Sequence, residues 1–137
     1  MQNHHNDVRV LIVDDQAAFR RALRNVVDLS PGFVAAGEAD TGEAAVEVAR
    51  EHHPDLVLMD VHLPGIDGPE ASRRILADST SGPPVIFLLS TYHPSEYADA
   101  TFLDGCGARA YLMKAEFGSA QLSATWSAAG AASGTRP

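Results

Sequence analysis

Five residues with charged or hydroxyl side chains stand at or just beyond the ends of short apolar runs, and they are Asp14, Asp15, Asp60, Ser90 and Lys114. Three carboxylates that share one crevice repel one another and have raised pKa values unless a cation lies among them. Mg²⁺ meets this need, because it prefers oxygen ligands and is commonly held by carboxylates together with a phosphate. Lys114, the only lysine of the chain, could neutralise a phosphoryl group, and the Ser90 hydroxyl could donate to it. The residue types therefore predict magnesium-dependent phosphate chemistry.

The apolar runs are the elements that must bring these residues together. They are rich in Val, Ile and Leu and are separated by amphipathic stretches of helical length, which is typical of a parallel sheet alternating with helices. We expect strands at residues 8–13, 33–37, 56–59, 85–89 and 109–112. Ligands of open parallel α/β sheets bind beyond the carboxyl ends of the strands, so the five residues should converge on one crevice. Helix caps alone would not explain four strand ends that all carry this chemistry.

Helices are expected between the strands, and the chain is expected to form one domain. The apolar spacing and the capping residues predict helices at residues 16–29, from Thr41 to before Pro54, at 69–77, 95–103 and 117–126. The domain should span residues 8–126, after an N-terminal extension at 1–7. Residues 127–137 lack large apolar side chains and predict a flexible tail or the start of a linker.

Composition narrows the class of protein further. The chain has 137 residues, of which 45% are apolar and 20% are charged, as in one globular domain. Its net charge of −8 argues against direct contact with nucleic acid, because phosphates would be repelled. Cys106 is the only cysteine, so no disulfide framework is expected, and no apolar run is long enough to span a membrane. We therefore expect a soluble, cytoplasmic protein.

The stretches around these residues resemble the receiver domain of two-component response regulators. They are VLIVDD at 10–15, DLVLMD at 55–60, LPGIDG at 63–68, VIFLLS at 85–90 and GARAYLMK at 107–114, in the order of the family. The resemblance covers residues 8–126, and its specificity lies in the conjunction of these elements. The residues around 14–16, 19–20 and 37–39 look most like receivers of the NarL/LuxR type, which are joined to a helix-turn-helix DNA-binding domain.

The resemblance implies a fold and a reaction. The fold would be flavodoxin-like α/β, a doubly wound five-stranded parallel sheet of order 2-1-3-4-5 flanked by five helices. Asp60 would accept a phosphoryl group from a histidine kinase in a Mg²⁺-dependent transfer. Asp15 and Asp60 would be direct Mg²⁺ ligands, Asp14 would act through water, and the backbone carbonyl of His62 would be a further ligand.

The resemblance also implies a switch rather than an enzyme with an external substrate. Ser90 and Tyr111 would form the switch pair, and Lys114 would bind the phosphoryl group. Phosphorylation would change the face built from the fourth helix, the fifth strand and the fifth helix, where a partner or a second copy would dock. The only chemistry expected is self-phosphorylation and autodephosphorylation, which would control transcription through an output domain absent from this chain.

Two departures from the family pattern leave alternatives open. Ala115 follows Lys114 where many members have proline, so the geometry of this loop cannot be carried over. The chain ends soon after its last expected helix, as would a single-domain regulator or a receiver cut from a longer protein. A Mg²⁺-dependent phosphohydrolase with an aspartyl nucleophile is another class, which His62 disfavours because it replaces the expected acidic residue. A receiver that binds partners without phosphorylation is disfavoured by the intact acidic set.

Overall fold

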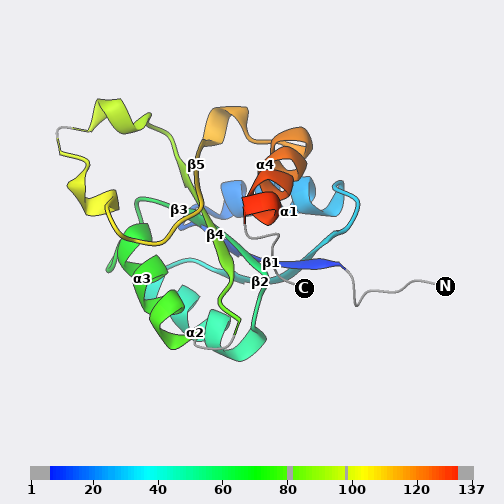
Figure 1. Ribbon diagram of the computed structural model, residues 1–137, viewed down its shortest axis with the longest axis horizontal. Coiled ribbons are helices and arrows are strands. Elements are labelled where there is room, and N and C mark those ends of the chain that lie inside the picture. The colour runs from blue at the N-terminus through cyan, green and yellow to red at the C-terminus, as the bar shows by residue number, and fades with distance from the viewer. Residues whose placement is uncertain (1–6, 80–81, 98, 133–137) are drawn as a thin grey trace.

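Five parallel strands form one sheet in the order β2-β1-β3-β4-β5, which confirms the order that the resemblance to receivers implies. The computed structural model describes residues 7–79, 82–97 and 99–132 (Figure 1). The strands are β1 (Val8–Val13), β2 (Phe33–Ala39), β3 (Leu56–Asp60), β4 (Val85–Ser90) and β5 (Ala110–Met113). The chain passes from β1 to β2 on one side and then crosses to β3 on the other, so the strand order reverses between β1 and β3. A crevice at this point is the usual ligand site of such sheets.

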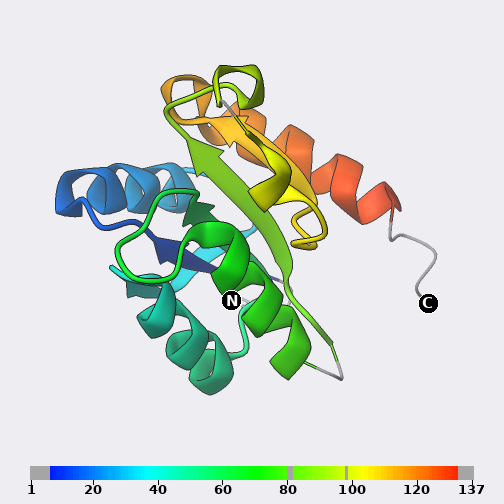
Figure 2. The same ribbon diagram turned by 90° about the vertical axis from the view of Figure 1, so that its left-hand side faces the viewer.

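Alternating side chains of the three central strands build two separate cores. Successive residues of a strand point to opposite faces of the sheet, and the strands between two helical layers are apolar on both faces. One core contains Val10, Ile12, Leu56, Leu58, Phe87 and Leu89 together with residues of the first and last helices. The opposite core contains Leu11, Val13, Val57, Met59, Ile86 and Leu88 together with residues of the second and third helices. Figure 2 shows these two helical layers on either side of the sheet.

The described chain has four α-helices, which are α1 (Ala17–Asp28), α2 (Gly42–His52), α3 (Gly68–Asp78) and α4 (Ser119–Ala132). The first three lie where the sequence predicts them, to within one residue at each end. The hydroxyl of Thr41 accepts the N–H of Ala44, and the carboxylate of Asp67 accepts the N–H of Glu70, so both residues act as N-caps. None of the described helices is both long and apolar enough to cross a membrane.

The helix expected at residues 95–103 does not form, and this prediction was wrong. Its place is taken by two short 3₁₀ turns, η2 (Pro94–Glu96) and η3 (Thr101–Leu103), so the described chain has four α-helices rather than five. The His93 ring accepts the N–H of Ser95, and the Asp99 carboxylate accepts the N–H of Thr101. Such local side-chain acceptors compete with the helical hydrogen bonds of the backbone.

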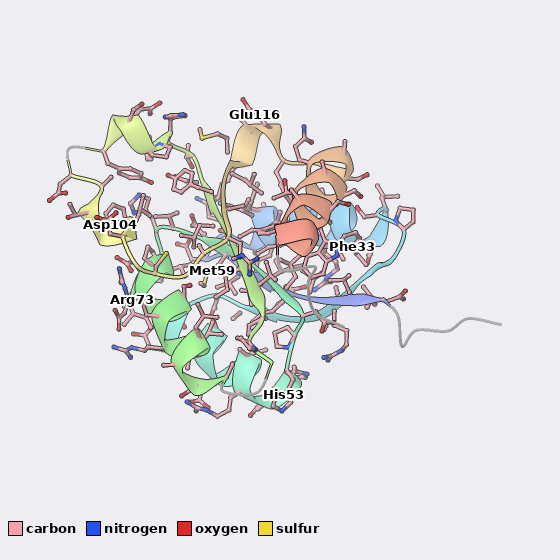
Figure 3. The ribbon with its side chains drawn as sticks, in the orientation of Figure 1. Phe33, His53, Met59, Arg73, Asp104 and Glu116 are labelled. Carbon is pink, nitrogen blue, oxygen red and sulfur yellow. The ribbon has the colours of Figure 1, made fainter. Side chains whose placement is uncertain are left out.

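The last helix starts two residues later and ends later than the sequence predicts. α4 continues to Ala132, so residues 127–132 are helical rather than part of a tail. Leu122 and Ala129, seven residues apart on one face, are buried against the sheet, and the Arg109 guanidinium donates to the carbonyl of Ala129 at 3.3 Å. Trp126 meets Phe33 edge to face at 6.2 Å, beside the helix in Figure 3. These contacts hold a helix that its own sequence favours only weakly. Of the expected extension at 1–7 and the expected tail at 127–137, residues 1–6 and 133–137 lie outside the described residues.

The turn between β3 and α3 requires a glycine at position 68. The Gly68 N–H donates to the carbonyl of Val61 at 2.8 Å, which places the start of α3 against the end of β3. A β-carbon at this position would collide with the carbonyl oxygen of Asp60 and lie 3.0 Å from the Cα of Val61. Both obstacles are backbone atoms, which cannot turn away as a flexible side chain can.

Replacing Gly68 with alanine should therefore destabilise the domain. We expect Gly68→Ala to lower the free energy of unfolding by about 2 kcal/mol, because the backbone around Asp60 must shift. Gly130→Ala is the matched control, since a β-carbon at Gly130 in α4 meets nothing within 4 Å. The control should unfold at the same or a slightly higher urea concentration. Equal midpoints for the two variants in urea titrations would contradict this account of Gly68.

Candidate functional site

Three carboxylates meet at the carboxyl ends of β1 and β3. Asp14 and Asp15 directly follow β1, Asp60 is the last residue of β3, and the two strands are neighbours paired through Val13 and Met59. One carboxylate oxygen from each aspartate lies within 4.8 Å of the other two. Asp14 is fully buried, Asp60 is 6% exposed and Asp15 is exposed. The structure thus brings together the acidic residues that the sequence singles out.

Lys114 is the cation that faces these carboxylates. It follows β5, and its Nζ lies 2.7 Å from Asp14 Oδ2 and 3.4 Å from Asp60 Oδ2. The Phe19 ring lies beneath the ammonium, 4.4 Å from ring centroid to Nζ, in a cation–π contact. One ammonium does not balance three carboxylates, so the charge that remains in this crevice is negative.

The donor set of this crevice fits a hard divalent cation. All its candidate ligands are carboxylate oxygens, which Mg²⁺ and similar ions prefer. Among the described residues, the buried Asp14 Oδ2 has no hydrogen-bond partner of normal alignment, although Lys114 Nζ is its close ionic neighbour. A buried carboxylate oxygen with an unused acceptor position can receive a hydrogen bond from a water of a hydrated ion. The acidic cluster could therefore bind a metal.

Backbone and side-chain hydrogen bonds hold Asp14 in place. Its Oδ1 accepts the N–H of Gln16 at 2.8 Å, and its own N–H donates to the carbonyl of Ala39 on β2 at 3.1 Å. Arg20 of α1 donates to the Asp14 carbonyl at 2.7 Å and pairs with Glu38 at 3.3 Å. Since α1, β1 and β2 all contribute, the carboxylate is fixed by the fold before any ligand binds.

Asp60 has a raised pKa in this environment. Burial is the main cause, the positive charge of Lys114 opposes it, and the negative charge of Asp14 adds to it. The N–H of His62 lies 3.3 Å from Asp60 Oδ1 and further favours the ionised form. His62 lies in the turn just beyond β3, two residues after Asp60. A cation in the crevice would favour the carboxylate form for the same electrostatic reason as Lys114 does.

Ser90 and Tyr111 form a second group beside the carboxylates. Ser90 ends β4, next to β3, and is fully buried, and its Oγ accepts the N–H of Tyr92 at 3.0 Å. Tyr111 on β5 donates to the carbonyl of Tyr92 at 2.7 Å, and burial raises the pKa of its phenol above the usual value. Ser90 and Tyr111 are linked through a third residue, Tyr97, whose hydroxyl lies 2.8 Å from Ser90 Oγ and 2.9 Å from that of Tyr111.

The sequence did not point to Tyr97. Its hydroxyl also lies 3.1 Å from Nε2 of His62, and its ring meets the ring of Phe102 edge to face at 5.2 Å. The sequence predicts that Tyr97 lies on a helix, which does not form, and an aromatic residue on an expected helix carries no functional signal. For His62 the resemblance implies a metal-ligand role of the backbone carbonyl, and the structure also brings its ring against Tyr97.

The comparisons with known proteins agree with this geometry. Residues 10–125 match the family described as response regulator receiver domain. The chain is 31% identical over 105 residues to the nitrate/nitrite response regulator protein NarL of Escherichia coli, covering 77% of this chain and 47% of that protein. It is 42% identical over 91 residues to protein-glutamate methylesterase/protein-glutamine glutaminase 2 of Anaeromyxobacter dehalogenans, covering 66% of this chain and 26% of that protein. The chain therefore spans less than half the length of these relatives.

A solved structure gives the same result for the whole domain. The signal receiver domain of the putative response regulator NarL from Mycobacterium tuberculosis superimposes with a TM-score of 0.78 at 30% sequence identity. The match covers 90% of this chain and 97% of that one. The likeness thus extends over the sheet, the helices and the crevice rather than over one motif.

Loss of the Lys114 charge should destabilise the metal-free protein. We expect Lys114→Met to lower the free energy of unfolding by about 3 kcal/mol in the presence of a chelator, because the buried Asp14 charge then lacks a partner. The double variant Lys114→Met/Asp14→Asn should recover most of this loss. Arg74→Met is the control, because Arg74 pairs with Glu70 on an exposed face of α3 and should matter little. A loss in the double variant as large as in the single one, measured by urea titration, would refute the charge explanation.

Because the pKa of Asp60 is raised, ionisation of this carboxyl lowers the stability of the folded protein. A carboxyl whose folded pKa exceeds its unfolded value binds more protons when folded, so stability falls as the pH rises from the unfolded pKa through the folded one. We therefore expect Asp60→Asn to unfold at a higher urea concentration than the parent at pH 7 with chelator. The difference should shrink when both are measured at about pH 3, below the usual Asp pKa. A variant less stable than the parent at pH 7 would contradict the sign.

Proposed function

The chain belongs to the response regulator receiver domain family, and we propose that it accepts a phosphoryl group on Asp60 from a phosphorylated histidine kinase. The observation that supports this most is the position of Asp60, whose carboxylate lies among two other carboxylates with the Lys114 ammonium at 3.4 Å. Receivers of this family are signalling proteins. The proposed role is therefore that of a signalling phosphoacceptor rather than an enzyme with an external substrate.

The proposed transfer is a nucleophilic displacement at phosphorus. An Asp60 carboxylate oxygen attacks the phosphorus of the phosphohistidine, a P–O bond forms, and the P–N bond breaks with its electron pair left on the imidazole nitrogen. Mg²⁺, when bound, offsets the negative charge of the transferring group. We assign Asp15 and Asp60 as its direct ligands, Asp14 as a ligand through water, and the backbone carbonyl of His62 as a further ligand.

Two side chains are proposed to receive the phosphoryl oxygens. The Lys114 ammonium already lies between Asp14 and Asp60, so a small movement would let it pair with a phosphoryl oxygen. The Ser90 hydroxyl ends the neighbouring strand and can donate to another oxygen. When Ser90 moves, Tyr111 should follow, because both side chains are joined through the same hydrogen-bonded group. The added charge of the phosphoryl group drives both changes.

The surface that responds is proposed to surround Tyr111. It consists of the segment with turns η2 and η3, strand β5 and helix α4, which replaces the expected face of two helices and a strand. We propose that an output domain, a partner protein or a second copy of the chain docks there. The NarL relative is named as a response regulator, and by analogy we propose transcriptional control in a cytoplasmic setting. Direct contact of this domain with nucleic acid is not proposed, given its net charge of −8.

A small phosphodonor tests the assignment of Asp60. With acetyl phosphate and Mg²⁺, the parent protein should gain one adduct of ~80 Da in intact mass spectrometry. Asp60→Asn should gain none, and a chelator should suppress the adduct on the parent, because charge offset is then lost. Asp55→Asn is the control, since Asp55 precedes β3 at the far end of the strand and should leave the adduct unchanged. An adduct of equal yield on Asp60→Asn would refute the proposal.

A further inference from the structure

The hydroxyl of Tyr97 is the centre of a hydrogen-bonded group beside the carboxylates. It lies 2.8 Å from Ser90 Oγ, 2.9 Å from the Tyr111 hydroxyl and 3.1 Å from His62 Nε2. These partners come from the end of β4, from within β5 and from the turn after β3. One phenol therefore joins three elements that border the site of Asp60.

The Ser90 hydroxyl is a member of this group. Ser90 is buried, and its Oγ has the N–H of Tyr92 and the hydroxyl of Tyr97 as partners, with no carboxylate among its hydrogen bonds in the described chain. A Ser90 hydroxyl that turns toward a phosphoryl group on Asp60 leaves its 2.8 Å contact with the Tyr97 hydroxyl. Tyr97 therefore stabilises the conformation that precedes phosphorylation.

Tyr97 also connects Ser90 to the two 3₁₀ turns. It directly follows η2, and its ring packs edge to face on Phe102 of η3 at 5.2 Å and tilted against His62 at 5.5 Å. The far end of this segment is held separately, because Arg73 of α3 donates to the carbonyls of Phe102 and Asp104 at 2.8 and 2.9 Å. Figure 3 shows Arg73 and Asp104 on the same side of the molecule. The segment is thus fixed at its end by Arg73 and at the site by Tyr97.

We propose that Tyr97 is a positioning residue that holds the Ser90 hydroxyl away from Asp60 and releases the turns η2 and η3 when Ser90 turns to the phosphoryl group. This inference rests on the proposed phosphorylation of Asp60. Ser90 and Tyr111 are the expected switch pair, and Tyr97 is a further residue that contacts both of them. Tyr97 also connects this pair to the segment with turns η2 and η3. The coupling is reciprocal, so whatever displaces Tyr97 should also favour phosphorylation.

The chain offers a matched pair of variants for the test. Tyr97→Phe removes the hydroxyl and keeps the ring that packs on Phe102 and His62. Tyr92→Phe makes the same chemical change on a ring of the same cluster, but the Tyr92 side chain is 49% exposed and its hydroxyl makes no hydrogen bond in the described chain. A difference between the two variants therefore reports the hydrogen bonds of Tyr97 rather than the loss of a phenol.

Beryllium fluoride with Mg²⁺, a mimic of the phosphoryl group on aspartate, is the probe for the first measurement. Tyr97→Phe should bind it about fivefold more tightly than the parent, the effect of about one hydrogen bond that no longer has to break. Tyr92→Phe should match the parent. Unchanged or weaker binding by Tyr97→Phe would overturn the inference while leaving the proposed function intact. Failure of the parent itself to bind the probe would overturn both.

Amide hydrogen exchange without the probe is the second measurement. The N–H groups of Glu96, Leu103 and Asp104 close the turns η2 and η3 through bonds to His93, Ala100 and Thr101. These amides should exchange at least about threefold faster in Tyr97→Phe than in Tyr92→Phe, because the segment loses its attachment to Ser90. Equal exchange in the two variants would show that packing alone holds the segment, and would overturn the role of Tyr97.

Discussion

The ionic contact between Lys114 and the two buried carboxylates of Asp14 and Asp60 constrains the rest of this domain. Three strands must end at the same edge of the sheet for these side chains to meet, and β1, β3 and β5 do so. The ammonium offsets part of the repulsion between the carboxylates, and the pKa of Asp60 is nevertheless raised, mainly by burial and further by the charge of Asp14. The negative charge that remains in the crevice destabilises the folded protein and also favours the binding of a divalent cation there.

The Ser90 hydroxyl lies next to this crevice but has no hydrogen bond to its carboxylates in the described chain. Ser90 stands beside Asp60 in the sheet, yet its hydrogen bonds lead away from the carboxylates toward Tyr97. A new anion on Asp60 would therefore compete with Tyr97 for the Ser90 hydroxyl. Competition of this kind gives two discrete arrangements of a packed group, which is what a switch requires.

The segment between β4 and β5 illustrates how tertiary contacts override local preference. Its sequence predicts a helix from Ser95, but the described residues form two 3₁₀ turns. Tyr97 and Phe102 pack in the aromatic cluster around His62. At the far end of the segment, Arg73 donates a hydrogen bond to the carbonyl of Phe102. The opposite case is α4, which the sequence favours weakly but which buries Leu122 and Ala129 against the sheet and extends to Ala132.

The sequence by itself determined the strands and the residues that end each of them. Apolar run length and caps such as Thr41 act locally and can therefore be found along the chain, whereas the order in which the strands pair came from the resemblance to receivers. Only the tertiary structure decided which groups pair in the crevice, such as Lys114 with Asp14, and which residue holds Ser90. Tyr97 could not be found from the sequence, because its role arises from contacts with His62 and Tyr111, which lie 35 and 14 residues away along the chain and leave no periodic pattern.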